Sequence, residues 1–293
     1  MNRRNSTISV LLLTVALTSV SCRAESGAAG GSQSGRRIFD EIMQKSEAEN
    51  WDGFDLGAIV QKVGTEFVGT RYEGGLLDHG DTEELVVTFA AFDCQLFIET
   101  VLAMARGIRE RDRSYEGFTR RLEEQRYRAG VRDGYCSRLH YFTEWIRDNE
   151  QRGIVQDVSA SLGGVREIRR LDFMSRHRDA YPRFASNDSV LAGIREMESG
   201  LAATEMFYVP EASIRERADL LRPGDIIATA TGIEGLDVSH TGLAYVSEDG
   251  SVGFLHASTK GGVTVAPDLQ SYLEGNAVQI GIVVVRPLEA AHE

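Results

Sequence analysis

Residues 225–258 decide the fold, and they read DIIATATGIEGLDVSHTGLAYVSEDGSVGFLHAS. They hold three short runs rich in Val, Ile and other strand-forming residues: DIIATAT, VSHTGLAYV and SVGFLHA. Two similar runs follow, GVTVA at 262–266 and AVQIGIVVVR at 277–286. The turn-forming segments EDG, KGG and EGN separate the later runs. The sequence therefore predicts a meander of about five antiparallel strands.

The residues before these strands have helical character. Apolar residues recur at helical spacing from Cys94 to about Glu110. Further helices are expected at 36–63, with a break near NWDGFD, and at 114–128, 138–152, 188–204 and 211–221. Helices first and strands second indicate an α+β fold in which the earlier helices cover the sheet. We expect the long segment at about 130–187 to be an extra helical insertion, and the charged runs RRLEEQR and IREMESG to be solvated helix faces.

Two histidines fall in predicted strands of one hairpin. If Glu248-Asp249-Gly250 forms a three-residue loop with a left-handed glycine, the register places Gly242 opposite His256. Because strand residues alternate between faces, His240 and His256 then become diagonal neighbours on one face, with Cβ atoms roughly 7–8 Å apart. A register slip of one residue would separate them.

Cys94 stands at the predicted start of a helix that packs on this sheet. It has three interpretations: a buried hydrophobic residue, a disulfide partner of Cys136, or a nucleophile. For a nucleophile, the helix N-terminus and an imidazolium would lower the thiol pKa to roughly 3.5–7.5. His240 would then act as base and acid, and His256 would orient it. A zinc site is a weaker interpretation because no CxxC or HxxxH pair is present.

The overall charge excludes one class of function. The formal net charge is −12 over 293 residues, and no basic stripe is present. Binding to nucleic acid requires clustered Lys and Arg to contact phosphates. We therefore expect no nucleic-acid partner.

The first 22 residues, MNRRNSTISVLLLTVALTSVSC, have the pattern of an export signal. Arg3 and Arg4 precede an apolar run that is too short to span a bilayer. Small residues before Cys22 indicate lipoprotein processing, although Ser19 departs from that pattern and soluble secretion is the alternative. We expect residues 23–36 to form a flexible Gly/Ser-rich linker. Residues 37–293 are then expected to form a single catalytic domain. This predicts a bacterial envelope protein tethered to the membrane through a lipidated Cys22.

The motifs together resemble a known family. VGTRYEGG, the Asp-Cys pair of FDCQLFIETVLAMA, VSHTGLAY and FLHAS resemble the NlpC-type papain-like cysteine peptidases of bacterial cell walls. The resemblance implies a papain-like core and places Cys94, His240 and His256 in the catalytic triad. It places Tyr72 on the active-site tyrosine. It requires no metal and no cofactor.

A longer match narrows the resemblance. YCSRLHYFTEWI, FMSRH and GDIIATATGIEGLDVSHTGLAY are similar to the N-acetylmuramoyl-L-alanine amidase-like branch, over about residues 55–287. That branch implies cleavage of the amide between the lactyl group of N-acetylmuramic acid and L-Ala, in peptidoglycan or muropeptide fragments, by a monomer. Many stem-cutting relatives have Ser after Asp-Cys to hold a free L-Ala amine, whereas this chain has Gln95. The alternatives are an L-Ala–D-Glu or D-Glu–diamino-acid endopeptidase, and a catalytically silent glycan-binding lipoprotein.

The resemblance also implies where substrate binds. The insertion motif SRLHYFTEW offers Arg138 to pair with a D-Glu carboxylate. The candidate substrate-binding residues are Asp93, Gln95, Arg138, His140, Tyr141 and Ser239.

Overall fold

The computed structural model describes residues 33–289. The predicted signal peptide, Cys22 and nearly all of the linker lie outside the described residues. Within 33–289, no helix is both long and apolar enough to cross a membrane.

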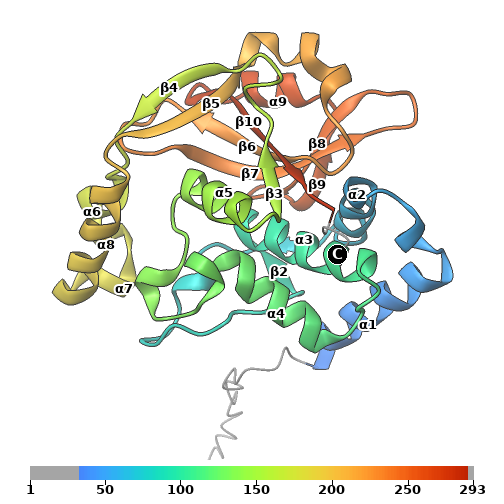
Figure 1. The fold of residues 1–293 in the computed structure, drawn as a ribbon, viewed down its shortest axis with the longest axis horizontal. Coiled ribbons are helices and arrows are strands. Elements are labelled where there is room, and N and C mark those ends of the chain that lie inside the picture. Colours follow the sequence, from blue (N-terminus) through green and yellow to red (C-terminus); the bar gives the residue numbers. More distant parts are fainter. Residues whose placement is uncertain (1–32, 290–293) are drawn as a thin grey trace, which may run out of the picture.

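A single large sheet forms the upper half of the molecule in Figure 1. It has eight strands, in the order β4-β5-β10-β6-β7-β8-β9, with β3 pairing on β10, and all neighbours are antiparallel. The strands are β3 (Val155–Asp157), β4 (Val165–Arg169), β5 (Thr204–Pro210), β6 (Ile226–Thr231), β7 (Val238–Val246), β8 (Val252–Ser258), β9 (Gly262–Ala266) and β10 (Gln279–Pro287).

The five predicted strands correspond to β6–β10, but the sheet has more strands than the five predicted. The sheet gains β3, β4 and β5, which lie in or after the segment expected to be a helical insertion. β4 reads VREIR and has no buried residue, so it lacks the apolar alternation that predicts a strand. β3 has only three residues. β5 begins at the last residue of the helix predicted at 188–204.

Helices cover both faces of the sheet. α2, α3 and α5 lie below it in Figure 1, whereas α9 lies on the opposite side. The α-helices are α1 (Gln33–Ala48), α2 (Leu56–Glu66), α3 (Cys94–Arg109), α4 (Tyr115–Arg126), α5 (Phe142–Gln151), α6 (Phe173–Arg176), α7 (Pro182–Ala185), α8 (Asp188–Gly200) and α9 (Leu269–Glu274). The segment predicted as a helix at 211–221 forms two 3-10 helices instead.

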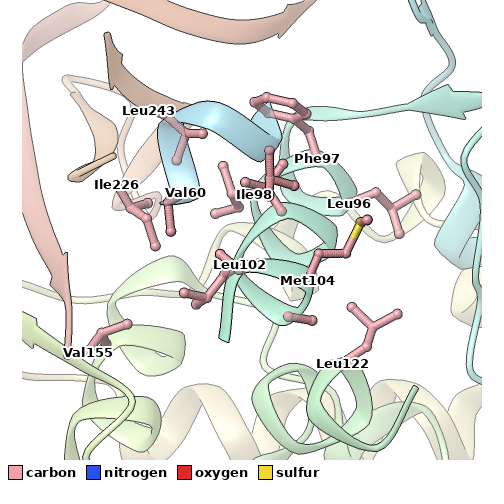
Figure 2. Close-up of a cluster of buried hydrophobic side chains, with 14 of the residues drawn as sticks. Val60, Leu96, Phe97, Ile98, Leu102, Met104, Leu122, Val155, Ile226 and Leu243 are labelled. Carbon is pink, nitrogen blue, oxygen red and sulfur yellow. The ribbon is translucent and has the colours of Figure 1, made fainter. Parts of the chain in front are cut away.

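α3 forms the centre of the larger core. Its residues from Leu96 to Ala105 are almost completely buried, so the helix is apolar on nearly all sides. Figure 2 shows its side chains between Val60 of α2, Leu122 of α4 and the strand residues Ile226 and Leu243. This central position fixes the α3 N-terminus, where Cys94 lies.

The faces of the sheet alternate between two cores. Leu243 and Leu255 contact the α3 core, whereas Ala244 and Phe254 belong to a second core with Leu273 of α9. This is the period-2 alternation expected for a sheet buried on both sides.

The insertion has a third core of its own. Tyr135, Phe184 and Leu191 are among its buried residues, drawn from segments around α6, α7 and α8. These helices lie together at the left side of Figure 1, beside the ends of β4 and β5.

Candidate active site

Cys94 is the first residue of α3. Its neighbour Asp93 is the N-cap, and its carboxylate accepts a hydrogen bond of 2.8 Å from the Leu96 amide. Just before it, β2 (Ala91–Phe92) pairs with β1 (Arg71–Tyr72), and Tyr72 lies opposite Phe92. The short ladder therefore holds Tyr72 beside the start of α3. Cys94 is half-buried and is a free thiol, as is Cys136, so no disulfide joins them.

The predicted hairpin register is confirmed. Leu243 lies opposite Leu255, and Gly250 in the loop has φ = +84°. This register brings His240 and His256 together as diagonal neighbours, and His240 Nε2 lies 2.8 Å from His256 Nδ1. His256 is only 3% exposed, and its ring stacks on Phe254 with centroids 4.7 Å apart.

The histidine pair lies on the α9 face of the sheet. His240 contacts Phe254, which belongs to the α9 core, whereas the body of α3 packs on the other face. Thr241, which follows His240 in β7, lies beside the Cys94 thiol and lowers its pKa. The end of α3 therefore approaches β7 at the residue next to His240.

Tyr272 is a site residue that sequence reasoning missed. Its ring lies 4.7 Å from that of His256 and 6.3 Å from that of His240. Burial raises the pKa of Tyr272, and the charge of a Cys94 thiolate raises it further. The pKa of Tyr72 is also raised, first by burial and then by the negative charges of a Cys94 thiolate and of Asp93. Two tyrosines from distant segments therefore lie near the thiol. A single Tyr in the turn-rich sequence between β9 and β10 gave no signal for this position.

The predicted low pKa of the thiol is wrong. Burial, followed by the neighbouring Asp93 carboxylate, raises the pKa of Cys94 to about 11. Burial and the proximity of His256 lower the pKa of His240 to about 3. The helix N-terminus is outweighed because the site is poorly hydrated and a carboxylate is adjacent. The Cys94 thiol and the His240 imidazole are therefore both expected to be neutral near pH 7.

The Asp93 carboxyl has a shifted pKa of its own. Burial raises it to about 6, and Glu99 adds to this, whereas the Leu96 amide and Arg126 oppose it. Asp93 is thus mainly ionised at neutral pH and becomes neutral in mild acid.

A pocket of about 250 Å³ opens beside Cys94. Four of the predicted site residues besides Cys94 line it: Asp93, Gln95, Arg138 and His140. The other lining residues are Gly75, Leu77, Asp78, Glu99, Arg126, Leu139, Phe142, Leu236, Asp237, Val238 and Thr241. The pocket therefore combines apolar walls with several charged groups.

Arg138 does not present a free guanidinium. Its Nη2 lies 2.6 Å from the Asp78 carboxylate, and its Nη1 donates to the Leu77 carbonyl. Glu83 lies 3.7 Å from Nη1 and adds a second negative charge. Pairing with a substrate carboxylate would have to displace these contacts, and the substrate-binding role of Arg138 stays a prediction.

The other residues predicted to bind substrate do not all lie at the pocket. His140 lines the pocket, but its Nε2 lies 2.8 Å from the Tyr135 carbonyl, and burial lowers its pKa well below the usual value. Tyr141 is wrongly predicted as a wall residue, because it is 2% exposed in the insertion core and donates to Glu198. Ser239 is exposed, with its hydroxyl 3.3 Å from that of Thr229.

Arg126 was missed because RRLEEQR was interpreted as a solvated face. Arg126 and Glu99 are each 1% exposed and form an ion pair of 2.7 Å. Trp145 and Gln95 donate to the other oxygen of Glu99. Arg121 of the same run is 3% exposed. Two arginines of the charged run are therefore buried, whereas Arg120 is exposed, and Arg126 belongs to a buried network around Glu99. No group of three His, Cys, Asp or Glu within 33–289 is placed to hold a metal.

The fold is a mixed α/β arrangement, with Cys94 at the start of α3 and the His240–His256 pair on two neighbouring strands of the sheet. A family model described as AmiA-like, N-acetylmuramoyl-L-alanine amidase-like, matches residues 62–282. The chain therefore belongs to this amidase-like family of peptidoglycan hydrolases.

Solved structures agree with the fold. An N-acetylmuramoyl-L-alanine amidase from Bacteroides uniformis ATCC 8492 is 32% identical, with a TM-score of 0.74 over 79% of this chain and 98% of that one. A candidate xylanase from Bacteroides fragilis is 35% identical, with a TM-score of 0.70 over 77% and 99%. Protein LPG0564 from Legionella pneumophila str. Philadelphia 1 shares the fold alone, at 20% identity and a TM-score of 0.64 over 87% and 97%. The curated proteins include no match.

Proposed function

We propose that the protein is a cysteine-dependent N-acetylmuramoyl-L-alanine amidase, which cleaves the amide between the muramic lactyl group and L-Ala. The observation that carries this proposal is the His240–His256 hydrogen bond of 2.8 Å on β7 and β8, with Thr241 of β7 beside the Cys94 thiol, in a chain of an amidase-like family. The order Tyr72, Cys94, His240 and His256 is that of the NlpC-type papain-like enzymes, and this relationship is part of the proposal.

The first half of the reaction transfers the muramoyl group to sulfur. Because His256 occupies Nε2 of His240, Nδ1 is the ring nitrogen left to accept the thiol proton. The Cys94 sulfur attacks the lactyl carbonyl as its proton moves to His240. The C–N bond then breaks, His240 returns the proton to the L-Ala nitrogen, and a thioester remains on Cys94.

The second half releases the sugar. A water molecule attacks the thioester while His240 accepts its proton, and the C–S bond breaks to restore the thiol. The products are a muramic lactyl carboxylate and a stem peptide with a free L-Ala amine. The neutral resting pair means that the thiolate forms only as the attack proceeds, so the proton transfer is coupled to C–S bond formation.

Two groups are placed to stabilise the oxyanion. The backbone N–H of Cys94 lies at the first residue of α3, where amides point out of the helix end. The Tyr72 hydroxyl belongs to the residue on β1 that is held beside this end. We assign both as donors to the developing negative charge.

Gln95 supports cleavage at the sugar side. Its side-chain amide donates a hydrogen bond of 3.0 Å to the Glu99 carboxylate. Gln95 therefore belongs to the buried network and not to an amine-binding site. The substrate of an amidase has no free amine on L-Ala, so it needs no such site. We also propose export to the envelope with a lipid anchor at Cys22, because the substrate is found there.

Mass spectrometry of defined muropeptides tests the proposal. Wild-type protein should release an intact stem that begins with L-Ala, and Cys94→Ala should release none. Cys136→Ala is the matched control, since Cys136 is a free thiol that lies away from the pocket in the insertion. Cleavage after L-Ala or D-Glu would reassign the protein as an endopeptidase. Activity lost on chelation of zinc would contradict the thiol mechanism.

A further inference from the structure

Thr241 turns its side chain towards the start of α3. It lies two residues before Leu243 in β7, and Leu243 packs in the core around α3, so the alternation of the strand places Thr241 on the same side. Thr241 lines the pocket together with Cys94 and is only 3% exposed. β7 therefore brings a hydroxyl, as well as His240, to the surroundings of the thiol.

The Thr241 hydroxyl is a buried polar group without a partner in the resting protein. Its oxygen makes no hydrogen bond with any of the residues that the structure describes. Burial of a hydroxyl without a hydrogen bond is unfavourable, and such groups are uncommon in native proteins. The Cys94 thiol lies beside it, but the sulfur of a neutral thiol is only a weak acceptor. The hydroxyl is therefore a donor whose neighbour accepts poorly in the resting state.

The backbone amide of Thr241 is also free of the sheet ladder. The Ala244 amide donates to the Asp225 carbonyl on the β6 side, so the N–H of Thr241, three residues earlier, points towards β8. The pairing of β7 with β8 ends at Leu243, and Thr241 has no partner there. Burial raises the pKa of the Cys94 thiol most, and both the hydroxyl and the amide of Thr241 oppose this increase. Two donors of one residue thus face the sulfur.

The charge on sulfur changes during the proposed reaction, and this change gives the two donors a role. The thiol is expected to be neutral near pH 7, so its sulfur gains negative charge only as the proton moves to His240. A hydrogen bond to a charged acceptor is about twice as strong as one to a neutral acceptor. Donors that are already in place therefore stabilise the transition state more than the resting enzyme.

We propose that Thr241 is a catalytic residue whose hydroxyl donates a hydrogen bond to the Cys94 sulfur whenever that atom carries negative charge. This occurs first when the thiol proton moves to His240 as the C–S bond forms. It occurs again when the C–S bond of the thioester breaks, the electron pair returns to sulfur, and His240 gives the proton back. The hydroxyl keeps its own proton throughout. The inference deepens the proposed amidase function and rests on it for these acyl-transfer steps.

Alkylation of Cys94 by iodoacetamide tests the contact without any substrate. Thr241→Val keeps the shape of the side chain but removes the donor, whereas Thr241→Ser keeps the donor. We expect the alkylation rate at pH 8 to fall about three- to tenfold in Thr241→Val and to stay within about twofold of wild type in Thr241→Ser. Thr204→Val is the matched control, because Thr204 is a buried residue of β5 whose hydroxyl donates to the Leu201 carbonyl away from the pocket.

Turnover of defined muropeptides gives the second measurement. Thr241→Val should lower kcat for release of the L-Ala stem about tenfold or more while KM changes less than about threefold, and Thr241→Ser should retain most of the activity. Urea denaturation should show no loss of stability in Thr241→Val, since the hydroxyl has no resting partner.

Three results would overturn the proposal. The first is a Thr241→Val protein with the alkylation rate and kcat of wild type. The second is a lower kcat with unchanged alkylation, because the hydroxyl would then serve a group other than the sulfur. The third is a loss of stability that Thr241→Ser does not share, because the hydroxyl would then be bonded elsewhere in the fold. Failure of the amidase function is distinguishable: wild type would release no L-Ala stem, while alkylation of Cys94 would still depend on the hydroxyl.

Discussion

His240 Nε2 and His256 Nδ1 lie 2.8 Å apart, on adjacent strands whose hairpin closes around Glu248-Asp249-Gly250, where the Ser247 amide donates to the Ser251 carbonyl. With a proton on His240 Nε2, His256 Nδ1 accepts, and His240 Nδ1 carries the lone pair needed to deprotonate a thiol. In the proposed mechanism this tautomer of His240 is the reactive one. The hydrogen bond also remains intact when His240 becomes an imidazolium, because the same N–H continues to donate.

The first prediction concerns this orienting role. We expect His256→Leu to lower kcat about 100-fold or more, because the tautomer and ring orientation of His240 are lost. His256→Asn retains an acceptor and should lose less. Steady-state release of the L-Ala stem measures both. His177→Gln is the matched control, since His177 is exposed in the insertion and stacks on Phe173. Wild-type kcat in His256→Leu would exclude the role.

The second prediction concerns the resting thiol. Because burial and Asp93 raise the pKa of Cys94 to about 11, its thiolate fraction should rise about tenfold per pH unit between pH 7 and 9. Iodoacetamide labelling of Cys94, followed by peptide mass spectrometry, gives the rate at each pH. A rate that levels off below pH 8 would show instead that a preformed thiolate–imidazolium pair exists in the resting enzyme.

The third prediction separates the two roles of Asp93. Asn caps helices about as well as Asp, so Asp93→Asn should retain the stability of α3 while removing the charge that raises the Cys94 pKa. We expect several-fold faster alkylation of Cys94 at pH 8. Asp93→Ala should accelerate alkylation but also lose about 1 kcal/mol of unfolding free energy. Slower alkylation in Asp93→Asn would mean that the carboxylate assists the thiolate.

Local patterns in the sequence were sufficient for the hairpin and for α3. The turn at Gly250 and the alternation of residues in β7 and β8 placed His240 beside His256, because a three-residue loop leaves a single register. Similarly, the apolar spacing after Cys94 predicted a buried helix that starts there. These features depend on residues close together in the chain.

The remaining parts of the site depend on contacts between distant segments. Tyr272 reaches the histidines from α9, and Arg126 pairs with Glu99 across two helices. A charged run cannot reveal that its partner is buried with it, so RRLEEQR was interpreted as solvent-facing. The prediction of a low pKa for the Cys94 thiol was wrong for the same reason, because that pKa depends on burial, which only the tertiary structure defines.

The fourth prediction concerns stability in acid. Burial lowers the pKa of His256 to about 4, against 6.5 for an unfolded histidine, so the unfolded chain binds more protons between these values. The stability linked to neutral His256 is complete above pH 6.5 and is lost as the pH falls towards 4. At pH 5 the loss is about 2 kcal/mol. Urea denaturation of wild type and His256→Gln at pH 7.5 and 5 should show their difference in free energy shifting by about this amount in favour of the variant. A constant difference would contradict the lowered pKa.

The fifth prediction tests the close approach of β7 and β8 at the histidine pair. A Cβ on Gly242 would lie 2.7 Å from the His256 Cβ and 2.6 Å from Phe254 Cε2, closer than packed carbon atoms allow. Gly242→Ala should therefore push His256 away from His240, lower kcat/KM at least tenfold, and cost about 1–3 kcal/mol of unfolding free energy. Gly232→Ala is the matched control, because its nearest neighbour would be Ile280 Cγ2 at 3.6 Å. Amidase assays and urea denaturation of both variants measure these effects. Because the clash exists only in the register that joins the two histidines, an active and stable Gly242→Ala would show that they do not form one catalytic unit.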